Sequence, residues 1–161
     1  MRQATVKVGD VMTAQPHACN TRDMLVAAAQ IMWDHDCGCV PVVDDDGKVV
    51  AMITDRDACM AAFTQGRTLG DIAVVTAMSS SVVTCKADDS IDDAERLMRQ
   101  NQVRRLPVTD EGGALVGVVS MNDLLRIHER HVRTAAGAGS LAGTLGAIGA
   151  PRAGRLTTAA A

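Results

Sequence analysis

An internal repeat restricts the fold of this chain more than any other feature of its sequence. When the 161 residues are aligned with themselves at an offset of 66, residues 12–57 match residues 78–123 without a gap. Eleven of the 46 aligned pairs are identical, whereas ordinary residue frequencies give about three. A solenoid needs roughly three or more repeats to bury a continuous core, and this unit occurs only twice. The sequence therefore predicts two similar units related by a pseudo-twofold axis.

Two helices are predicted in each copy. Apolar residues recur at helical spacing in 25–32 and in 91–98, which indicates a helix with one apolar face in each copy. A second helix is expected at about 56–63 in copy one and 122–132 in copy two. The expected N-caps of the first helices are Asn20 or Thr21 and Asp89 or Ser90, with Asp23 and Asp93 in the first turns.

A β-hairpin is predicted between the two helices of each copy. β-branched runs joined by Asp- and Gly-rich turns occur at 40–43 with 49–53, and at 106–109 with 115–120. Pro41 and Pro107 cannot donate to a β-ladder, so their strands are expected at a sheet edge or to begin there. The order helix, strand, strand, helix, repeated twice, predicts an α+β fold in which helices cover one face of a small sheet.

The chain is divided into three segments. Copy one is assigned to residues 1–66 and copy two to residues 67–133. The remaining segment, 134–161, contains 16 Ala or Gly residues and is expected to be a flexible tail. Within it, apolar residues at i, i+4 and i+7 leave two alternatives for 140–148, a short docking helix or plain disorder.

The composition excludes several classes of function. A net charge of −3 gives no general basic surface, and Trp33 and Phe63 are the two aromatic residues, so nucleic-acid binding is not expected. No apolar stretch is strong enough for a membrane span, and residues 1–10 lack the apolar run of a signal peptide, which favours a cytoplasmic location. The chain also lacks a Ser/His/Asp arrangement, a P-loop or a paired-carboxylate signature, so it is not expected to be an enzyme.

Five cysteines, an odd number without a secretion signal, favour reduced thiols over a disulfide framework. Cys37 and Cys39, with His35 nearby, could be structural thiols, a redox pair or part of a soft-metal site. Two thiols and one imidazole are an incomplete ligand set, so no metal site is assigned. Cys19 and Cys85 occupy equivalent positions in the two copies and are expected to serve packing.

The second strand of each hairpin ends in the same polar pattern. An apolar residue is followed by a hydroxyl, any two residues and a carboxylate, with Thr54 and Asp57 in copy one and Ser120 and Asp123 in copy two. A hydroxyl beside the unpaired amides of a helix start suits an anion, and a carboxylate one turn later can accept from two ribose hydroxyls. The same spacing is that of a helix capping box. The residues alone leave both interpretations open.

Three motifs recur at the same offset: Pro-Val-x-Asp at 41–44 and 107–110, a turn glycine at 47 and 113, and the hydroxyl-x-x-Asp pattern at 54–57 and 120–123. Together they resemble a tandem pair of cystathionine-β-synthase-type (CBS) domains, or Bateman module, over about 8–130. Residues 35–38 and 54–57 are similar to small stand-alone bacterial pairs, including the hypoxic-response type. The resemblance implies two pseudo-symmetric β-α-β-β-α repeats packed as one CBS-pair module, which commonly associates as a homodimer.

The resemblance also implies two clefts that can bind adenosyl ligands such as AMP, ADP, ATP or S-adenosylmethionine, none of them a required cofactor. Asp57 and Asp123 would hold the ribose hydroxyls, while Thr54 and Ser120 would face the ribose or phosphate. The residues expected to line the cleft formed with the other copy's Asp are Thr13 and Ser79.

The two clefts are expected to differ in charge. Arg104 and Arg105 occupy positions where the family often has a basic side chain that contacts phosphate, and Asn122 belongs to the same cleft. The alternative interpretation is that the two arginines lie on a solvent-exposed strand edge and bind no ligand. Copy one has Gly38 and Cys39 at the equivalent positions, where Arg56 could supply a cation. The Asp123 cleft is therefore predicted to bind phosphate better, and the Asp57 cleft to be empty or selective for a less charged ligand.

Two functions remain for the chain at this point. The leading hypothesis is a non-catalytic sensor that binds an adenine nucleotide or adenosyl ligand and signals to an unidentified protein partner through a change of shape or association. The alternative is a stress-response structural or interaction protein whose clefts are vestigial and bind no nucleotide.

Overall fold

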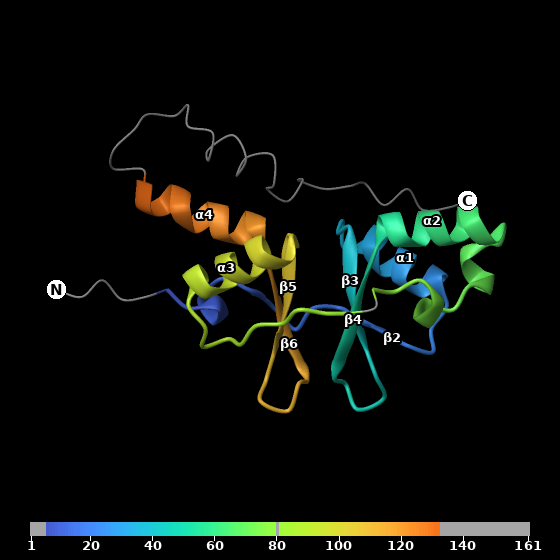
Figure 1. The fold of residues 1–161 in the computed structure, drawn as a ribbon, viewed down its shortest axis with the longest axis horizontal. Coiled ribbons are helices and arrows are strands. Elements are labelled where there is room, and N and C mark those ends of the chain that lie inside the picture. Colours follow the sequence, from blue (N-terminus) through green and yellow to red (C-terminus); the bar gives the residue numbers. More distant parts are fainter. Residues whose placement is uncertain (1–5, 80, 133–161) are drawn as a thin grey trace.

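The computed structural model describes residues 6–79 and 81–132, with side chains described as far as residue 127. Each copy forms a hairpin flanked by two helices, and the two copies lie next to each other with their hairpins adjacent (Figure 1). The predicted α+β fold of two repeats is therefore confirmed. The predicted tail and its segment 140–148 lie outside the described residues.

All four predicted helices and both predicted hairpins are present. The elements of copy one are β1 (Thr13–Ala14), β2 (Cys19–Asn20), α1 (Leu25–Asp34), β3 (Cys39–Val43), β4 (Val49–Thr54) and α2 (Asp55–Gln65). Those of copy two are α3 (Ile91–Asn101), β5 (Arg105–Thr109), β6 (Leu115–Ser120) and α4 (Met121–Val132). Short 3-10 helices lie at Val8–Asp10, Leu69–Asp71 and Val74–Thr76.

The helix starts of α1 and α3 differ from each other. Ser90, one of the two residues expected to cap α3, does so by accepting a hydrogen bond from the amide of Asp93. Neither Asn20 nor Thr21 caps α1, whose N-cap position is Met24 without a side-chain hydrogen bond. The expectation for α1 was wrong because the carboxylate of Asp23 closes the turn before the helix, where it accepts from the amide of Asn20 at 2.7 Å.

Neither proline strand lies at a free edge of its sheet, contrary to the expectation. In copy two, β5 with Pro107 pairs with β6 on one side, and on the other side Cys85 bridges to it, where the Cys85 amide donates to the carbonyl of Pro107 at 3.1 Å and the Cys85 carbonyl accepts from the amide of Thr109 at 2.9 Å. The copy-one sheet has the order β2–β3–β4, which places β3 with Pro41 in the middle. This is tolerated because β2 pairs with Val42 and Val43 and leaves Pro41 without a partner strand on that side.

The opening segments of the two copies are exchanged between the sheets. Strand β1 of copy one pairs antiparallel with β6 of copy two, with Thr13 opposite Val118. In the reverse direction, Ser79 of copy two binds β4 of copy one, because its amide donates to the carbonyl of Met52 at 3.0 Å and its hydroxyl accepts from the Met52 amide at 3.1 Å. Each sheet is therefore completed by a segment from the other copy.

The tips of the two hairpins are also joined by backbone hydrogen bonds. The amide of Val49 donates to the carbonyl of Gly113 at 3.1 Å, and the amide of Leu115 donates to Gly47 at 3.3 Å. Both glycines have positive φ, +77° and +87°, a conformation that glycine adopts without strain. The duplicated turn glycines thus shape the turns through which the copies meet.

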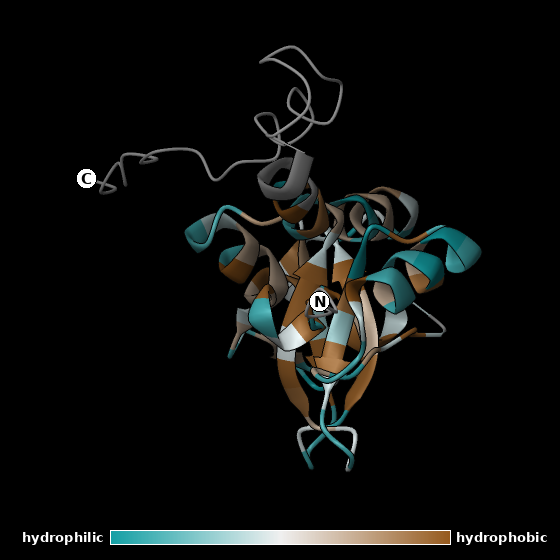
Figure 2. Cartoon of the chain, turned by 90° about the vertical axis from the view of Figure 1, so that its left-hand side faces the viewer, coloured by the Kyte–Doolittle hydropathy of each residue, from teal (hydrophilic) through white to brown (hydrophobic). Residues whose placement is uncertain are grey.

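Two hydrophobic clusters form the core, one in each copy. The strands are the most apolar elements and lie between helices with polar outer faces (Figure 2). Val8 of the opening segment is buried in the cluster of copy two, whereas Ile72 and Val74 are buried in that of copy one. Within 6–79 and 81–132, no helix combines the length and apolar character needed to cross a membrane.

Candidate functional site

The junction of β4 and α2 is a reciprocal capping box. The amide and the hydroxyl of Thr54 donate to Oδ2 of Asp57 at 2.9 and 2.7 Å. The amide of Asp57 donates in return to Oγ1 of Thr54 at 3.2 Å. The capping interpretation therefore describes this pair as it stands in the structure.

The junction of β6 and α4 repeats this geometry. The amide and hydroxyl of Ser120 donate to Oδ2 of Asp123 at 2.8 and 2.6 Å, and the Asp123 amide donates to the Ser120 hydroxyl at 3.3 Å. The second oxygen of Asp123, Oδ1, pairs with the guanidinium of Arg126 at 3.3 Å. Capping thus fixes the orientation of the carboxylate and leaves Oδ1 to the partly exposed ion pair.

A small hollow opens beside the Ser120 junction. It has a volume of about 110 Å³, and it is lined by Arg104, Arg105, Ser120, Met121 and Asn122. The start of β5 is tied to the start of α4 because the amide of Met121 donates to the carbonyl of Arg104 at 2.9 Å. The structure therefore brings together four of the residues predicted for the copy-two cleft, and places Asp123 one residue further along α4.

The size of the hollow limits what it can enclose. Its volume corresponds to about four water molecules, whereas drug-sized ligands occupy pockets of about 300–1,000 Å³. A phosphate group fits such a space next to two guanidinium groups and the first amides of a helix. A nucleoside attached to that phosphate would extend out of the hollow along the protein surface.

The structure places Thr13 and Ser79 on the sheets that carry the other copy's carboxylate. Thr13 lies opposite Val118, two residues before the Ser120 junction. The hydroxyl of Ser79 accepts from Met52, two residues before the Thr54 junction. Neither residue lines the hollow at Ser120.

The equivalent position in copy one has a different chemistry. The amide of Asp55 donates to the carbonyl of Gly38 at 3.2 Å, which matches the bond between Met121 and Arg104. Gly38 and the buried Cys39 replace the two arginines, and Arg56 at the helix start is exposed. The predicted asymmetry between the two junctions is thus visible in their side chains.

The positive charge of Arg105 nevertheless acts on two thiols of copy one, an effect that the sequence did not predict. Burial raises the pKa of the Cys39 thiol to about 11, and the positive charges of Arg105 and Arg104 act against this rise. Burial also raises the pKa of Cys37, and Arg105 again acts in the opposite direction. The arginines at the start of β5 therefore lie close enough to the start of β3 to act on the thiols of Cys37 and Cys39.

Burial favours the protonated form of the thiols of Cys19, Cys39 and Cys85. Burial raises the pKa of Cys19 to about 11 and that of Cys85 to about 12, and their thiols contact the carbonyls of Pro41 and Pro107. A thiolate is the form that attacks electrophiles and binds metals, so these shifts favour structural roles. Residues 6–79 and 81–132 contain no cluster of three His, Cys, Asp or Glu side chains suited to a metal, although the rings of His17 and His35 stack at 3.8 Å.

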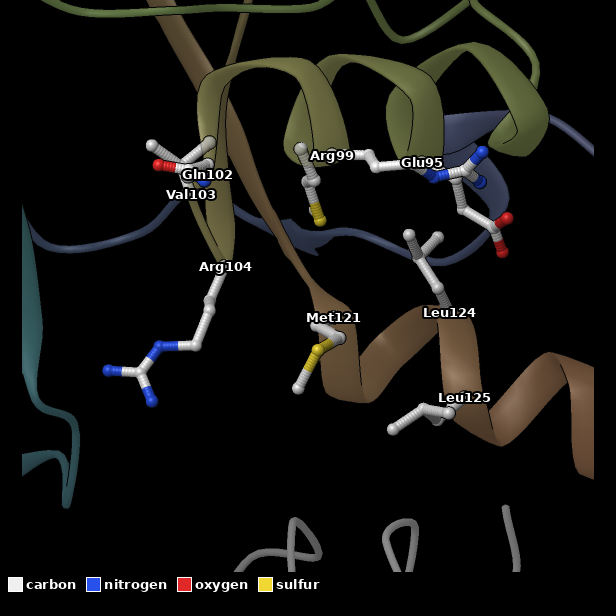
Figure 3. A pocket seen from close by; sticks show the side chains of 9 residues that line it. Glu95, Arg99, Gln102, Val103, Arg104, Met121, Leu124 and Leu125 are labelled. Carbon is white, nitrogen blue, oxygen red and sulfur yellow. The ribbon is translucent and has the colours of Figure 1, made fainter. Parts of the chain in front are cut away.

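A larger groove lies between α3 and α4 and adjoins the hollow at Ser120. It has a volume of about 500 Å³, with an apolar lining of Met98, Val103, Met121, Leu124 and Leu125. Arg104 belongs to both spaces, and Figure 3 shows its side chain directed away from the two leucines. The apolar lining suits hydrophobic contact better than the recognition of a charged ligand.

Comparisons with known proteins find the same architecture. The model of the CBS domain matches residues 8–63 and 69–130. The CBS domain-containing protein YhcV of Bacillus subtilis is 38% identical over 117 residues, which is 73% of this chain and 81% of YhcV.

Two crystal structures are similar over most of the described chain. Hypoxic Response Protein I with two coordinated zinc ions gives a TM-score of 0.68 at 31% identity, covering 75% of this chain and 98% of that one. The CBS domain pair of protein MJ0100 in complex with 5-methylthioadenosine and S-adenosyl-L-methionine gives a TM-score of 0.70 at 25% identity, with coverages of 80% and 99%.

Proposed function

The chain belongs to the CBS-domain family, and from that premise we propose that it is a non-catalytic sensor module for an adenine nucleotide or another adenosyl ligand. Ligand binding would be passed on through a change of shape or of association. The observation that carries the proposal is the hollow at the Ser120 junction, where two arginines meet the start of α4.

The chemistry of this hollow supports a phosphate-bearing ligand. Arg104 and Arg105 supply fork-shaped donors that match phosphate, and the N-terminus of α4 favours an anion. Asp123 is held one residue beyond the hollow, where a carboxylate can accept hydrogen bonds from ribose hydroxyls. AMP, ADP and ATP combine both groups, so they are the proposed ligands of the copy-two cleft.

A different ligand is proposed for the copy-one cleft. Gly38 and Cys39 supply no charge there, while Thr54 and Asp57 keep the ribose-binding pattern. An adenosyl compound without phosphate therefore suits this cleft. The similar pair of protein MJ0100 binds compounds of this class, namely 5-methylthioadenosine and S-adenosyl-L-methionine.

The size of the hollow also favours a second candidate, an interaction protein whose clefts bind no nucleotide. About 110 Å³ holds one phosphate group, and both carboxylates already serve as helix caps. Under this alternative, the family fold would be used only as a scaffold for association.

A thermal shift experiment separates the two candidates. AMP, ADP, ATP, S-adenosylmethionine, adenosine and inorganic phosphate are each added at millimolar concentration to the full chain. A ligand present at about 100 times its Kd stabilises the fold by about 2.7 kcal/mol, which raises Tm by about 5–10 °C for a chain of this size. Shifts that rise from adenosine to ATP support the sensor, and unchanged melting with all six compounds supports the interaction protein.

A further inference from the structure

The apolar groove between α3 and α4 plays no part in the proposed ligand site, although Arg104 borders both spaces. Its lining includes the buried side chains of Met98 and Leu124, together with Met121, which is 42% exposed, and the half-buried Leu125. Figure 3 shows Met121, Leu124 and Leu125 on α4, opposite α3. A volume of about 500 Å³ lies within the range of about 300–1,000 Å³ of specific binding pockets, so the groove can bind several apolar side chains.

An apolar stripe that matches this groove occurs in the sequence shortly after α4. Leu141, Leu145 and Ile148 stand at i, i+4 and i+7, a spacing that puts all three on one face of a helix. Ser140 before the stripe is a preferred N-cap residue, and Gly149 after it is a preferred residue just beyond a helix end. The sequence therefore supplies a start, an apolar face and a stop for one short helix.

The segment also matches the groove in polarity. Residues 134–151 contain no Asp, Glu, Lys, Arg or His, so packing them against apolar side chains removes no charge from water. Between the three apolar residues of 141–148 stand only Ala, Gly and Thr, which are small enough to let a helix lie close to its neighbours. The groove and the segment are thus complementary in size and in chemistry.

We propose that residues 140–148 form a helix that fills the α3–α4 groove of their own chain, with the apolar stripe packed between the two helices. In this arrangement the segment runs back along α4, and α4 and the segment form a helical hairpin. Gly143 and Gly146 weaken the helix in isolation, so it forms only in contact with the groove. Burial of the stripe and of the groove lining supplies the driving force.

The connection between α4 and the segment is long enough for this arrangement. Helix α4 ends at Val132, and the seven residues 133–139 span up to about 23–25 Å when extended. The part of α4 from Met121 to Val132 is about 17 Å long. Connections of about 2–8 residues are common between packed helices. The stripe can therefore reach every residue of α4 that lines the groove.

The short connection also favours the chain's own segment over a separate partner. A segment tethered by seven residues has an effective concentration of about millimolar near its own groove. A second chain, or another protein, present at micromolar concentration must compete with the tethered segment. The chain's own stripe therefore covers the groove first.

Hydrogen exchange of the full chain, measured by mass spectrometry, tests the proposal. The amides of 141–148 should exchange at least about 10-fold more slowly than in a free peptide of the same sequence. Leu145→Asp and Leu125→Asp place a charge in the contact from its two sides, so each should abolish this protection. Leu156→Asp is the matched control, because Leu156 lies in the same uncovered part of the sequence but outside the stripe, and it should leave the protection unchanged.

Leu145→Asp gives the decisive comparison because it changes no residue of the two repeats. Circular dichroism verifies that each variant is folded, and a folding defect in Leu125→Asp leaves the decision to Leu145→Asp. Wild-type amides of 141–148 that exchange as fast as those of the free peptide overturn the proposal. Protection that persists in Leu145→Asp overturns it as well, because the stripe would then not be the contact.

Dilution separates the chain's own segment from that of a second copy. When the segment binds its own groove, the protection of 141–148 stays constant over a dilution of about 100-fold, because the tether fixes the effective concentration. When the segment binds the groove of another copy, the protection falls on dilution. Loss of protection on dilution would therefore overturn the proposal that the groove is filled within one chain.

Discussion

Replacing Asp123 by alanine separates the capping role of this carboxylate from its proposed role at the ribose. The change removes the two hydrogen bonds from Ser120 to Oδ2 and the ion pair with Arg126. The Ser120 hydroxyl can still accept from the amide of residue 123, so the variant loses one half of the capping box, which costs up to about 2 kcal/mol of stability and lowers Tm by up to about 8 °C in a chain of this length. Loss of a charged hydrogen bond to a nucleotide costs about 1.5–3 kcal/mol of binding, or about 10- to 150-fold in Kd.

Asp93→Ala is the matched control for this experiment. Asp93 accepts from the Ser90 hydroxyl at 2.7 Å, its amide donates back at 3.1 Å, and it pairs with Arg96 three residues later. The control therefore loses the hydroxyl–carboxylate bond and the same type of ion pair at a helix start that does not line the hollow. Its melting temperature should fall as well, while its affinity for ATP should equal that of the wild type.

Isothermal titration calorimetry with ATP at 25 °C, on samples verified as folded, measures the three affinities. The expected order is wild type equal to Asp93→Ala, with Asp123→Ala weaker by at least 10-fold. Wild-type affinity in Asp123→Ala would refute the assignment of this carboxylate to the ribose. Equal weakening in both variants would show that the loss comes from destabilisation and not from a ligand contact.

Two further predictions concern thiol reactivity and packing. Iodoacetamide at pH 8 should label the exposed Cys59 in the native protein, but Cys85 only after denaturation, because burial raises the pKa of Cys85 to about 12. Mass spectrometry measures the two labelling rates, and equal rates would contradict this prediction. Gly117→Ala should lower the free energy of unfolding, measured by urea denaturation, by about 1–3 kcal/mol, because an added Cβ would collide with the Met12 side chain. The equivalent residue of copy one is Ala51, so alanine itself suits this strand position. Unchanged stability would mean that Met12 moves aside freely.

Much of the fold could be predicted because the informative patterns are local and occur twice. Turn glycines at 47 and 113 and the β-branched runs beside them locate both hairpins, and the helical spacing of apolar residues locates α1 and α3, while α2 and α4 were expected from their place after each hairpin. The predicted resemblance to CBS pairs is confirmed by the family match and by the similar structures. The hydroxyl-x-x-Asp pattern also located both junctions, because a capping box forms within four consecutive residues.

The features that the sequence did not predict depend on contacts between distant residues. Strand β1 is two residues long and has no periodicity, so its pairing with β6 cannot be read from residues 13 and 14. The influence of Arg105 on Cys39 depends on how the two copies pack, which no motif records. The cap of α1 was missed because Asn20 and Thr21 are suitable cap residues by type, and only the turn closed by Asp23 delays the helix to Leu25.

The exchange of opening segments has a consequence for biosynthesis. Residues 8–14 are synthesised about a hundred residues before their partner strand β6, an interval of about 5–20 s at common rates of translation. During that interval Val8 and Met12 have no core to enter, while copy one obtains Ile72 and Val74 soon after its own helices and can fold first. During synthesis, copy one can thus be folded while the apolar segment 8–14 still waits for copy two to bind it.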